Sequence, residues 1–183
     1  ACLFPLAVLH AENAAPPPRI AYWLSDDPTL TAESVLRPAF QTQFRPAPRG
    51  GLSFGFTDAA LWVRIELANP DTRARERILV AGYPMLDDIR LYERRDHRIL
   101  ERQSGDLRPF RERELDYRNV TFRLTLPPQT TRIFYLRVAT ASAMNLPLAI
   151  HTPEDFAALE RSETIFFAMY YAALAVMLLY NAL

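Results

Sequence analysis

An uncharged apolar run at the C-terminal end, residues 165–183, constrains the fold of this chain more than any other feature. A helix of about 19 apolar residues is long enough to cross the hydrocarbon core of a bilayer. The alternative is a helix buried in a soluble protein, but a chain of 183 residues builds little core to cover a helix that is apolar on all sides. We therefore predict a membrane helix over residues 164–183, with Glu160 and Arg161 on its aqueous side.

A second, shorter apolar run occupies residues 2–9, and small residues and three prolines at 16–18 follow it. This order is typical of the end of a secretory signal peptide. We expect residues 1–15 to be a signal peptide that lacks its basic start; a buried N-terminal strand is the alternative. The two ends together predict a domain over residues 16–160 that lies outside the membrane and is anchored through 165–183.

Between the two ends, apolar and polar residues alternate with the period of two that half-buried strands show. Turn sequences rich in proline, glycine and aspartate separate the strand-like segments. The predicted strands cover residues 61–67, 78–81, 89–92, 120–126, 133–138 and 146–150. Strands without intervening helices predict an all-β fold, an antiparallel sandwich. Short helical segments are expected at 31–40, capped by Thr31, and from Pro153 onward, capped by Thr152.

The composition excludes several classes of function. A hydrophobic fraction of 50% supports a packed core and excludes a largely disordered chain. The 21 basic and 21 acidic side chains cancel, which argues against a nucleic-acid partner. Cys2 is the only cysteine and the three histidines are far apart in the sequence, so no metal site is predicted. No spacing of carboxylates places an acid beside a nucleophile, and we predict no catalytic residues and no cofactor.

Several short motifs follow one another along the chain. They are YWLSDD at 22–27, SFGFT at 53–57, ALWVR at 60–64, YPMLD at 83–87, IRLY at 89–92, SGD at 104–106, YLRV at 135–138, YY at 170–171 and LLYN at 178–181. In order and spacing they closely resemble the 7TMR-DISMED2 domain, the periplasmic sensor of bacterial receptors with seven transmembrane helices and diverse intracellular signalling modules. The resemblance covers roughly residues 20–160, and the helix at 165–183 looks like the first of the seven.

The resemblance implies a fold and a biological role. It implies a jelly roll akin to carbohydrate-binding modules, in a sensor that passes a periplasmic signal through the bacterial inner membrane. It implies an output that is a diguanylate cyclase, a cyclic-di-GMP phosphodiesterase or a histidine kinase. We therefore expect the chain to be a piece of such a receptor, with the output beyond Leu183.

The outward face of the predicted sheet carries candidate ligand-binding residues. Two strands each place an aromatic residue and an arginine two positions apart on this face, and a further aromatic residue and arginine lie at strand ends or in loops. Aromatic rings cover the apolar faces of a sugar, and guanidinium groups bind hydroxyls or a carboxylate. We predict a concave surface for a small polar ligand, a carbohydrate or a carboxylate. The residues of this surface are Trp62, Arg64, Tyr83, Arg113, Tyr135 and Arg137.

The same residue pattern has a structural interpretation. The aromatic residues could form a second small core under a loop, and outward arginines on strands commonly pair with nearby carboxylates. Arg64 would then pair with Glu66, and Arg137 with Glu66 or an aspartate nearby. An open cleft that contains Trp62 and both arginines favours ligand binding, whereas a cleft filled by side chains favours the second core.

Two other functions remain open from the sequence. The domain could bind no small molecule and act as a platform for a homodimer or a partner protein, with Phe110, Tyr117 and Tyr135 as interface anchors. A carbohydrate-binding module of a secreted enzyme is a third interpretation, and the C-terminal apolar helix argues against it.

Overall fold

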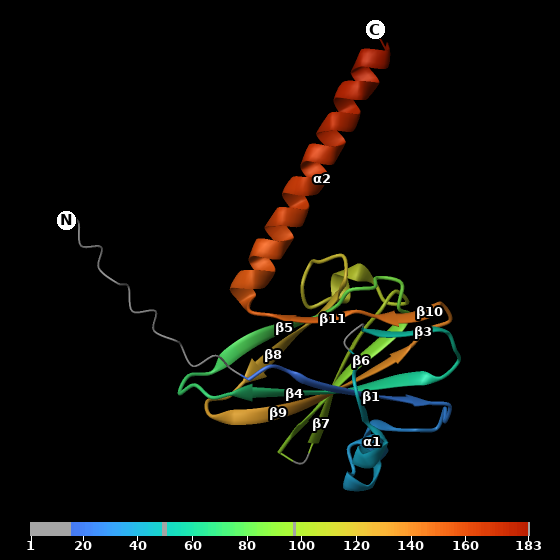
Figure 1. Cartoon of the computed structure of the whole chain (residues 1–183), viewed down its shortest axis with the longest axis vertical. Helices are drawn as coiled ribbons and strands as arrows, with labels where there is room; N and C mark the ends of the chain where they lie inside the picture. The colour runs from blue at the N-terminus through green and yellow to red at the C-terminus, as the bar shows by residue number, and fades with distance from the viewer. Residues whose placement is uncertain (1–15, 49–50, 97, 183) are drawn as a thin grey trace, which may run out of the picture.

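A computed structural model of the chain describes residues 16–48, 51–96 and 98–182, so the predicted signal peptide lies outside the described residues. Antiparallel strands make up most of the domain, and one long helix leaves it at the C-terminal end (Figure 1). The strands are β1 (Arg19–Ser25), β2 (Arg45–Pro46), β3 (Leu52–Phe56), β4 (Ala60–Asn69), β5 (Arg75–Ala81), β6 (Asp88–Arg95), β7 (Arg98–Ser104), β8 (Val120–Leu126), β9 (Thr130–Ala139), β10 (Ala143–Leu146) and β11 (Leu148–His151). The helical elements are α1 (Ala32–Val35), η1 (Pro38–Gln43), η2 (Phe110–Glu112) and α2 (Pro153–Ala182).

The strands form three antiparallel sheets. One sheet has six strands in the order β2-β1-β4-β9-β6-β7, a second has the order β11-β5-β8, and a third pairs β10 with β3. The strands predicted over 61–67, 78–81, 89–92, 120–126 and 133–138 are confirmed. The segment predicted as a strand over 146–150 is divided, because Pro147 lies between β10 and β11, which belong to different sheets.

The main core lies between the six-stranded sheet and the two smaller sheets. Alternate residues of the central strands point into it, including Leu61, Val63 and Ile65 of β4 and Leu136 of β9, all with an exposed fraction of 0%. Phe122 of β8 meets them from the opposite side. The period of two in the sequence therefore reports the inward face of the sheet correctly.

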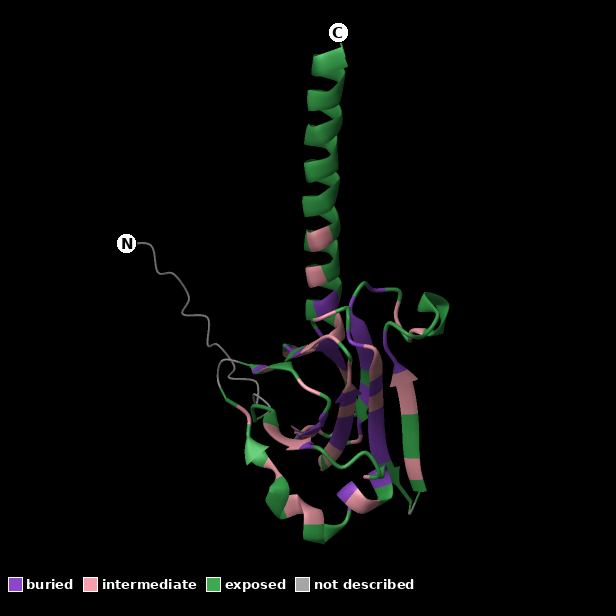
Figure 2. Ribbon diagram, turned by 90° about the vertical axis from the view of Figure 1, so that its right-hand side faces the viewer, coloured by how far each residue is buried: buried purple, intermediate pink, exposed green. Residues whose placement is uncertain are grey.

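The long helix α2 follows β11 directly and extends out of the domain (Figure 2). The hydroxyl of Thr152 accepts a hydrogen bond from the backbone nitrogen of Asp155 at 3.1 Å, as expected for an N-cap. Phe156 is the buried residue of this helix, and most of the residues beyond it are exposed. The helix is long and apolar enough to cross a membrane, with a mean hydropathy of 1.7 in its most apolar part.

Asn69, at the end of β4, joins two turns at one edge of the core. Its side-chain nitrogen donates to the carbonyl oxygens of Arg73 at 2.9 Å, Leu126 at 3.0 Å and Pro127 at 2.9 Å. Its side-chain oxygen accepts a hydrogen bond from the backbone nitrogen of Asp71 at 3.2 Å. One buried amide thus satisfies backbone groups of the β4–β5 turn and of the end of β8.

Replacing Asn69 with alanine tests whether these hydrogen bonds stabilise the domain. We expect Asn69→Ala to lower the free energy of unfolding by about 1–3 kcal/mol, because buried carbonyl oxygens lose their donor. Thermal unfolding followed by circular dichroism measures the change. Asn145→Ala, on the exposed side of β10, is the matched control and should change stability by less than about 0.5 kcal/mol. Equal destabilisation by the two variants would contradict the assignment.

Candidate ligand-binding face of the six-stranded sheet

The outward face of the six-stranded sheet brings together four of the residues predicted from the sequence. Trp62 on β4 lies opposite Arg137 on β9, and Arg64 lies opposite Tyr135. Directly opposed residues of an antiparallel pair point to the same face, so these four side chains are neighbours. Because the two strands are antiparallel, Arg137 of β9 lies beside Trp62 of β4, and Arg64 of β4 lies beside Tyr135 of β9.

Strand β6 extends this face on the other side of β9. Arg90 lies opposite Arg137, and Tyr92 lies opposite Tyr135. The rings of Trp62 and Tyr92 are stacked with centroids 5.8 Å apart. The face therefore carries aromatic rings in its middle and guanidinium groups on both sides of them.

The segment that connects β1 to β2 lies across the aromatic part of this face. We call residues 31–44, which include α1 and η1, the helical cover. Val35 and Leu36 of the cover are buried in one apolar cluster with Trp62 and Tyr135. As a result Trp62 has an exposed fraction of 0%, and its ring forms part of a second core instead of an open cleft.

One side chain of the cover, Gln41, connects it to the sheet. The hydroxyl of Tyr135 donates to the side-chain oxygen of Gln41 at 2.9 Å. The side-chain nitrogen of Gln41 donates to the carbonyl oxygen of Val35 at 2.9 Å. The amide therefore holds the two helical parts of the cover together and attaches them to β9. Gln41 was not predicted, because its sequence neighbours give no sign that its side chain reaches the sheet.

Both arginines of the predicted pairs have carboxylate partners. A guanidinium nitrogen of Arg64 lies 2.8 Å from a carboxylate oxygen of Glu66, and one of Arg137 lies 3.2 Å from Asp88. These are the local ion pairs that the structural interpretation of the sequence expects. The arginine side chains remain partly exposed, at 25% and 22%.

A hollow of about 430 Å³ lies on one side of the cover, and we call it the Tyr135 hollow. Its lining residues are Leu36, Pro38, Gln41, Arg64, Arg94, Thr131, Arg132, Ile133 and Tyr135. Three of these residues are arginines, and among the described residues that line it none is acidic. The hollow therefore combines apolar side chains with a positive rim, which suits a small anion that carries an apolar part.

A second hollow, of about 360 Å³, lies on the other side of the cover, and we call it the Arg137 hollow. Its sheet side is formed by Arg90, Tyr92, Ile99, Glu101 and Arg137, and residues 28–33 close it. Two carboxylates, of Glu33 and Glu101, and two guanidinium groups therefore line this hollow, and their charges balance.

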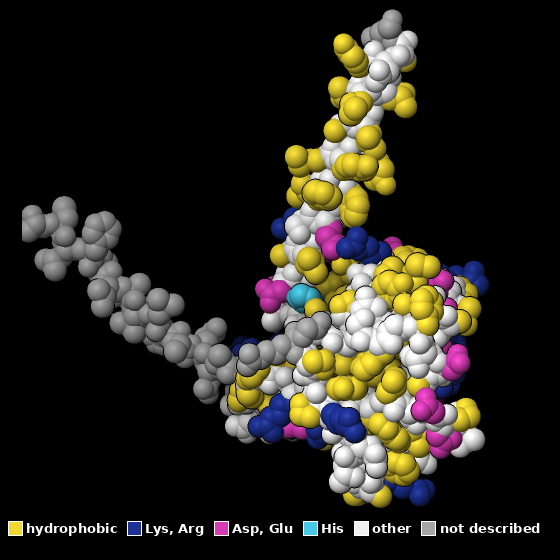
Figure 3. Space-filling view, turned by 45° about the vertical axis from the view of Figure 1, so that its right-hand side comes forward, with side chains coloured by type: hydrophobic (Ala, Val, Ile, Leu, Met, Phe, Trp, Pro, Cys, Tyr) yellow, Lys and Arg dark blue, Asp and Glu magenta, His cyan; other side chains and the backbone are white. Residues whose placement is uncertain are grey.

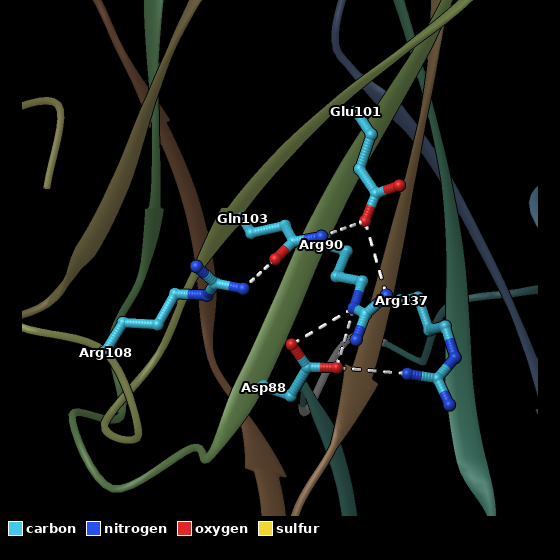
Figure 4. A network of polar contacts seen from close by, with 6 residues as sticks. All are labelled: Asp88, Arg90, Glu101, Gln103, Arg108 and Arg137. Carbon is cyan, nitrogen blue, oxygen red and sulfur yellow. Dashed lines mark hydrogen bonds and ion pairs between the residues drawn. The ribbon is translucent and has the colours of Figure 1, made fainter. Parts of the chain in front are cut away.

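Asp88 is the centre of the polar network beside the Arg137 hollow (Figure 4). It accepts hydrogen bonds from Nε of Arg90 at 2.8 and 3.1 Å and from Arg137 at 3.2 Å. Burial lowers the pKa of the Arg90 guanidinium, but the hydrogen bond and the charge of Asp88 outweigh burial and raise it above its ordinary value. Burial, followed by the charge of Glu101, raises the pKa of Tyr92. Both side chains keep the protonation state that they have in neutral solution.

Tyr83 and Arg113 lie elsewhere in the domain. Tyr83 is half-buried against the main core. Arg113 follows η2 and donates to the carbonyl oxygens of Tyr117 at 3.0 Å and Arg118 at 2.7 Å. Neither residue lines the hollows beside the cover. The structure thus brings together four of the six predicted residues and gives Arg113 a place in a different contact.

Tyr117 and Arg118, whose carbonyl groups Arg113 binds, join the domain to the base of α2. The hydroxyl of Tyr117 donates to one carboxylate oxygen of Glu163 at 2.9 Å, and Arg118 donates to the other at 2.9 Å. The ring of Tyr117 also packs edge-on against Phe156, with centroids 5.0 Å apart. Glu163 is the last charged residue before the apolar run, which was the available signal for this junction in the sequence.

The described residues contain no group of three or more histidine, cysteine, aspartate or glutamate side chains that could hold a metal ion. The outward face offers hydrogen bonding and ion pairing through guanidinium groups, beside apolar and aromatic surface.

An antiparallel β-domain carried by one long apolar helix is the architecture of an extracellular domain anchored in a membrane. The family model described as 7TMR-DISM extracellular 2 matches residues 17–152, and the chain belongs to this family. It is an extracellular sensor domain of 7TMR-DISM receptors, and α2 is the membrane-spanning helix that follows it. No protein with a curated function matches the chain significantly.

Removing the hydroxyl of Tyr135 should loosen the helical cover. In Tyr135→Phe the ring still fills the second core, but Gln41 loses its donor, so we expect faster amide exchange over residues 31–44 and a loss of about 1 kcal/mol in stability. Hydrogen–deuterium exchange with mass spectrometry measures both effects. Tyr22→Phe on β1 is the control. In this variant the amides of residues 31–44 should exchange at the same rate as in the unchanged chain. Unaltered exchange in Tyr135→Phe would show that the hydrogen bond does not hold the cover.

Alkaline pH should weaken the junction between the domain and α2. Burial, then the hydrogen bond to Glu163, raises the pKa of Tyr117, so the junction is intact below the ordinary tyrosine pKa of about 10 and is lost as the pH rises through the higher folded value. Tyrosine ring NMR, assigned with Tyr117→Phe, follows this ionisation. Glu163→Gln should lower the pKa of Tyr117 because it removes the neighbouring charge. An unshifted titration in Glu163→Gln would contradict the contact.

Proposed function

We propose that this sensor domain binds a small ligand with a carboxylate group in the Tyr135 hollow. The observation that carries the proposal is the charge of its lining, in which three arginines and no acidic residue surround an apolar floor. Arg94 is exposed at the rim, whereas Arg64 pairs with Glu66 at 2.8 Å and Arg132 lies 3.8 Å from a carboxylate oxygen of Glu93. Guanidinium groups in this arrangement can bind a carboxylate through charge-assisted hydrogen bonds.

A carbohydrate is supported less well than a carboxylate by the same geometry. A sugar needs an uncovered aromatic face, but Trp62 and Tyr135 are covered by side chains of the helical cover. In this proposal Tyr135 acts as the inner wall of the hollow, and Trp62 supports the wall from behind. Arg137 lines the neighbouring Arg137 hollow. In this proposal it affects the ligand indirectly, through the position of the helical cover that separates the two hollows.

We further propose that ligand binding controls a cytoplasmic output through α2, with residues 164–183 forming the first of seven membrane helices. The proposed output is a diguanylate cyclase, a cyclic-di-GMP phosphodiesterase or a histidine kinase, as the family resemblance implies. The junction of Tyr117 and Arg118 with Glu163 supports this route, because it connects the folded domain to the helix at the membrane boundary. We also propose that the facing sheets form a jelly roll akin to carbohydrate-binding modules.

A ligand-independent platform for a homodimer or a partner protein is the second candidate function. The covered aromatic residues and the paired arginines of the outward face support it. Of its three candidate anchors, however, Tyr117 and Tyr135 are buried and Phe110 is exposed. The platform would therefore have to use a different part of the surface from the hollows.

Binding assays on the chain with two arginine variants test the ligand proposal. We expect a member of a panel of amino acids, dicarboxylates and uronic acids to bind, and Arg64→Gln and Arg94→Gln each to weaken that binding about tenfold or more. Isothermal titration calorimetry measures the affinities, with neutral sugars in the same panel. Arg98→Gln, on exposed strand β7, is the charge-matched control and should bind normally.

Three outcomes would contradict the proposal. They are an absence of carboxylate binding, equal affinity in both hollow variants and the control, and binding of neutral sugars alone. The first outcome combined with a stable dimer in analytical ultracentrifugation would favour the platform instead.

A further inference from the structure

The exposed apolar side chains of the domain include a group in two loops near the base of α2. Leu107 is 78% exposed, Met85 55% and Phe110 51%, although each is large and apolar. Figure 3 shows apolar side chains gathered on the part of the domain from which α2 leaves. We call Met85, Leu107 and Phe110 the apolar tip. Large exposed side chains grouped on one surface mark a contact with another molecule or with a membrane.

The two loops of the apolar tip are held against each other by their backbones. The amide of Asp106 donates to the carbonyl oxygen of Leu86 at 2.9 Å, and that of Leu107 donates to Asp87 at 3.3 Å. Gly105 has a φ of +141°, and a Cβ atom there would lie 2.1 Å from the carbonyl oxygen of Asp87. Only glycine fits this close approach, so the tip is built as one unit with a fixed orientation.

The loop that carries Phe110 leads to Arg118, whose side chain reaches the level at which α2 enters its apolar run. Arg118, at the end of this loop, binds Glu163 and places its guanidinium group 5.7 Å from the ring centroid of Phe167. Phe167 is the third residue of the uncharged run, so Arg118 lies at the boundary between water and bilayer. Figures 1 and 2 both place η2 at the height of the base of α2, set apart from the helix.

We propose that the apolar tip inserts into the interface of the leaflet that α2 enters, and so fixes the domain against the membrane surface. The apolar tip is connected to the membrane helix through Arg113, Arg118 and Glu163, and this connection selects the bilayer as the occupant. Arg113 lies over the ring of Phe110, with its guanidinium carbon 4.7 Å from the centroid. Such a pair presents an apolar ring to lipid and a cation to the phosphate groups, as interfacial residues do.

Spin labels at the apolar tip test the proposal in the 183-residue chain, reconstituted in nanodiscs of phosphatidylethanolamine and phosphatidylglycerol. Cysteines replace Leu107, Phe110 or, as a control, Leu100, in a Cys2→Ser background. Leu100 is also exposed, at 44%, but lies on β7 at the end of the domain opposite α2 (Figure 1). We expect labels at 107 and 110 to be more accessible to oxygen than to a water-soluble nickel chelate, and the label at 100 to show the reverse.

Equal accessibility at all three positions would overturn the proposal. So would protection of the tip labels from both reagents, because this would place them against protein. If spin–spin broadening accompanied that protection and vanished on dilution with unlabelled chain, the occupant would be a second copy of the chain.

Discussion

Burial of the central strands on both faces is the constraint on which the rest of this structure depends. Strand β4 points Leu61, Val63 and Ile65 into the main core and Trp62 into a second core under the helical cover. Because the cover occupies the middle of the outward face, the Tyr135 hollow and the Arg137 hollow lie beside it, where part of the sheet remains accessible. The position of the candidate site is thus set by where a short helical segment ends on the six-stranded sheet.

The sequence predicts which residues share a face, but not what covers that face. A period of two fixes the side of each strand residue, so Trp62, Arg64, Tyr135 and Arg137 were correctly placed together. The cover contains only scattered apolar residues, such as Val35 and Leu36, and their burial depends on docking to strands that are distant in sequence. Pattern alone therefore leaves open whether Trp62 lines a cleft or packs in a second core, and tertiary packing decides for the second core.

The charged loop before β8 shows the same limit for electrostatics. From the sequence, an alternation of arginine and glutamate at 111–114 indicates a solvated segment that pairs with itself. In the structure Glu114 instead pairs with Arg102 of β7 at 2.9 Å and accepts a hydrogen bond from the backbone of Arg123. Residues that lie close together in sequence find partners on other strands, and only the fold decides which. The junction at Glu163 arises in the same way.

The distance between the two ends of the domain limits how a ligand could act on the membrane. The helical cover and α2 lie at opposite ends (Figure 1), so a local change beneath the cover must be carried by the sheets. A ligand can shift an arrangement only by the difference in its affinity for the two states. The hydrogen bond between Tyr135 and Gln41 is neutral and contributes about 1 kcal/mol, less than a carboxylate can gain from guanidinium groups. Full displacement of the cover would also expose Val35 and Leu36, at about 1.5–3 kcal/mol for each side chain. In the proposed function a bound anion would therefore shift the Tyr135–Gln41 contact while the apolar packing of the cover stays in place.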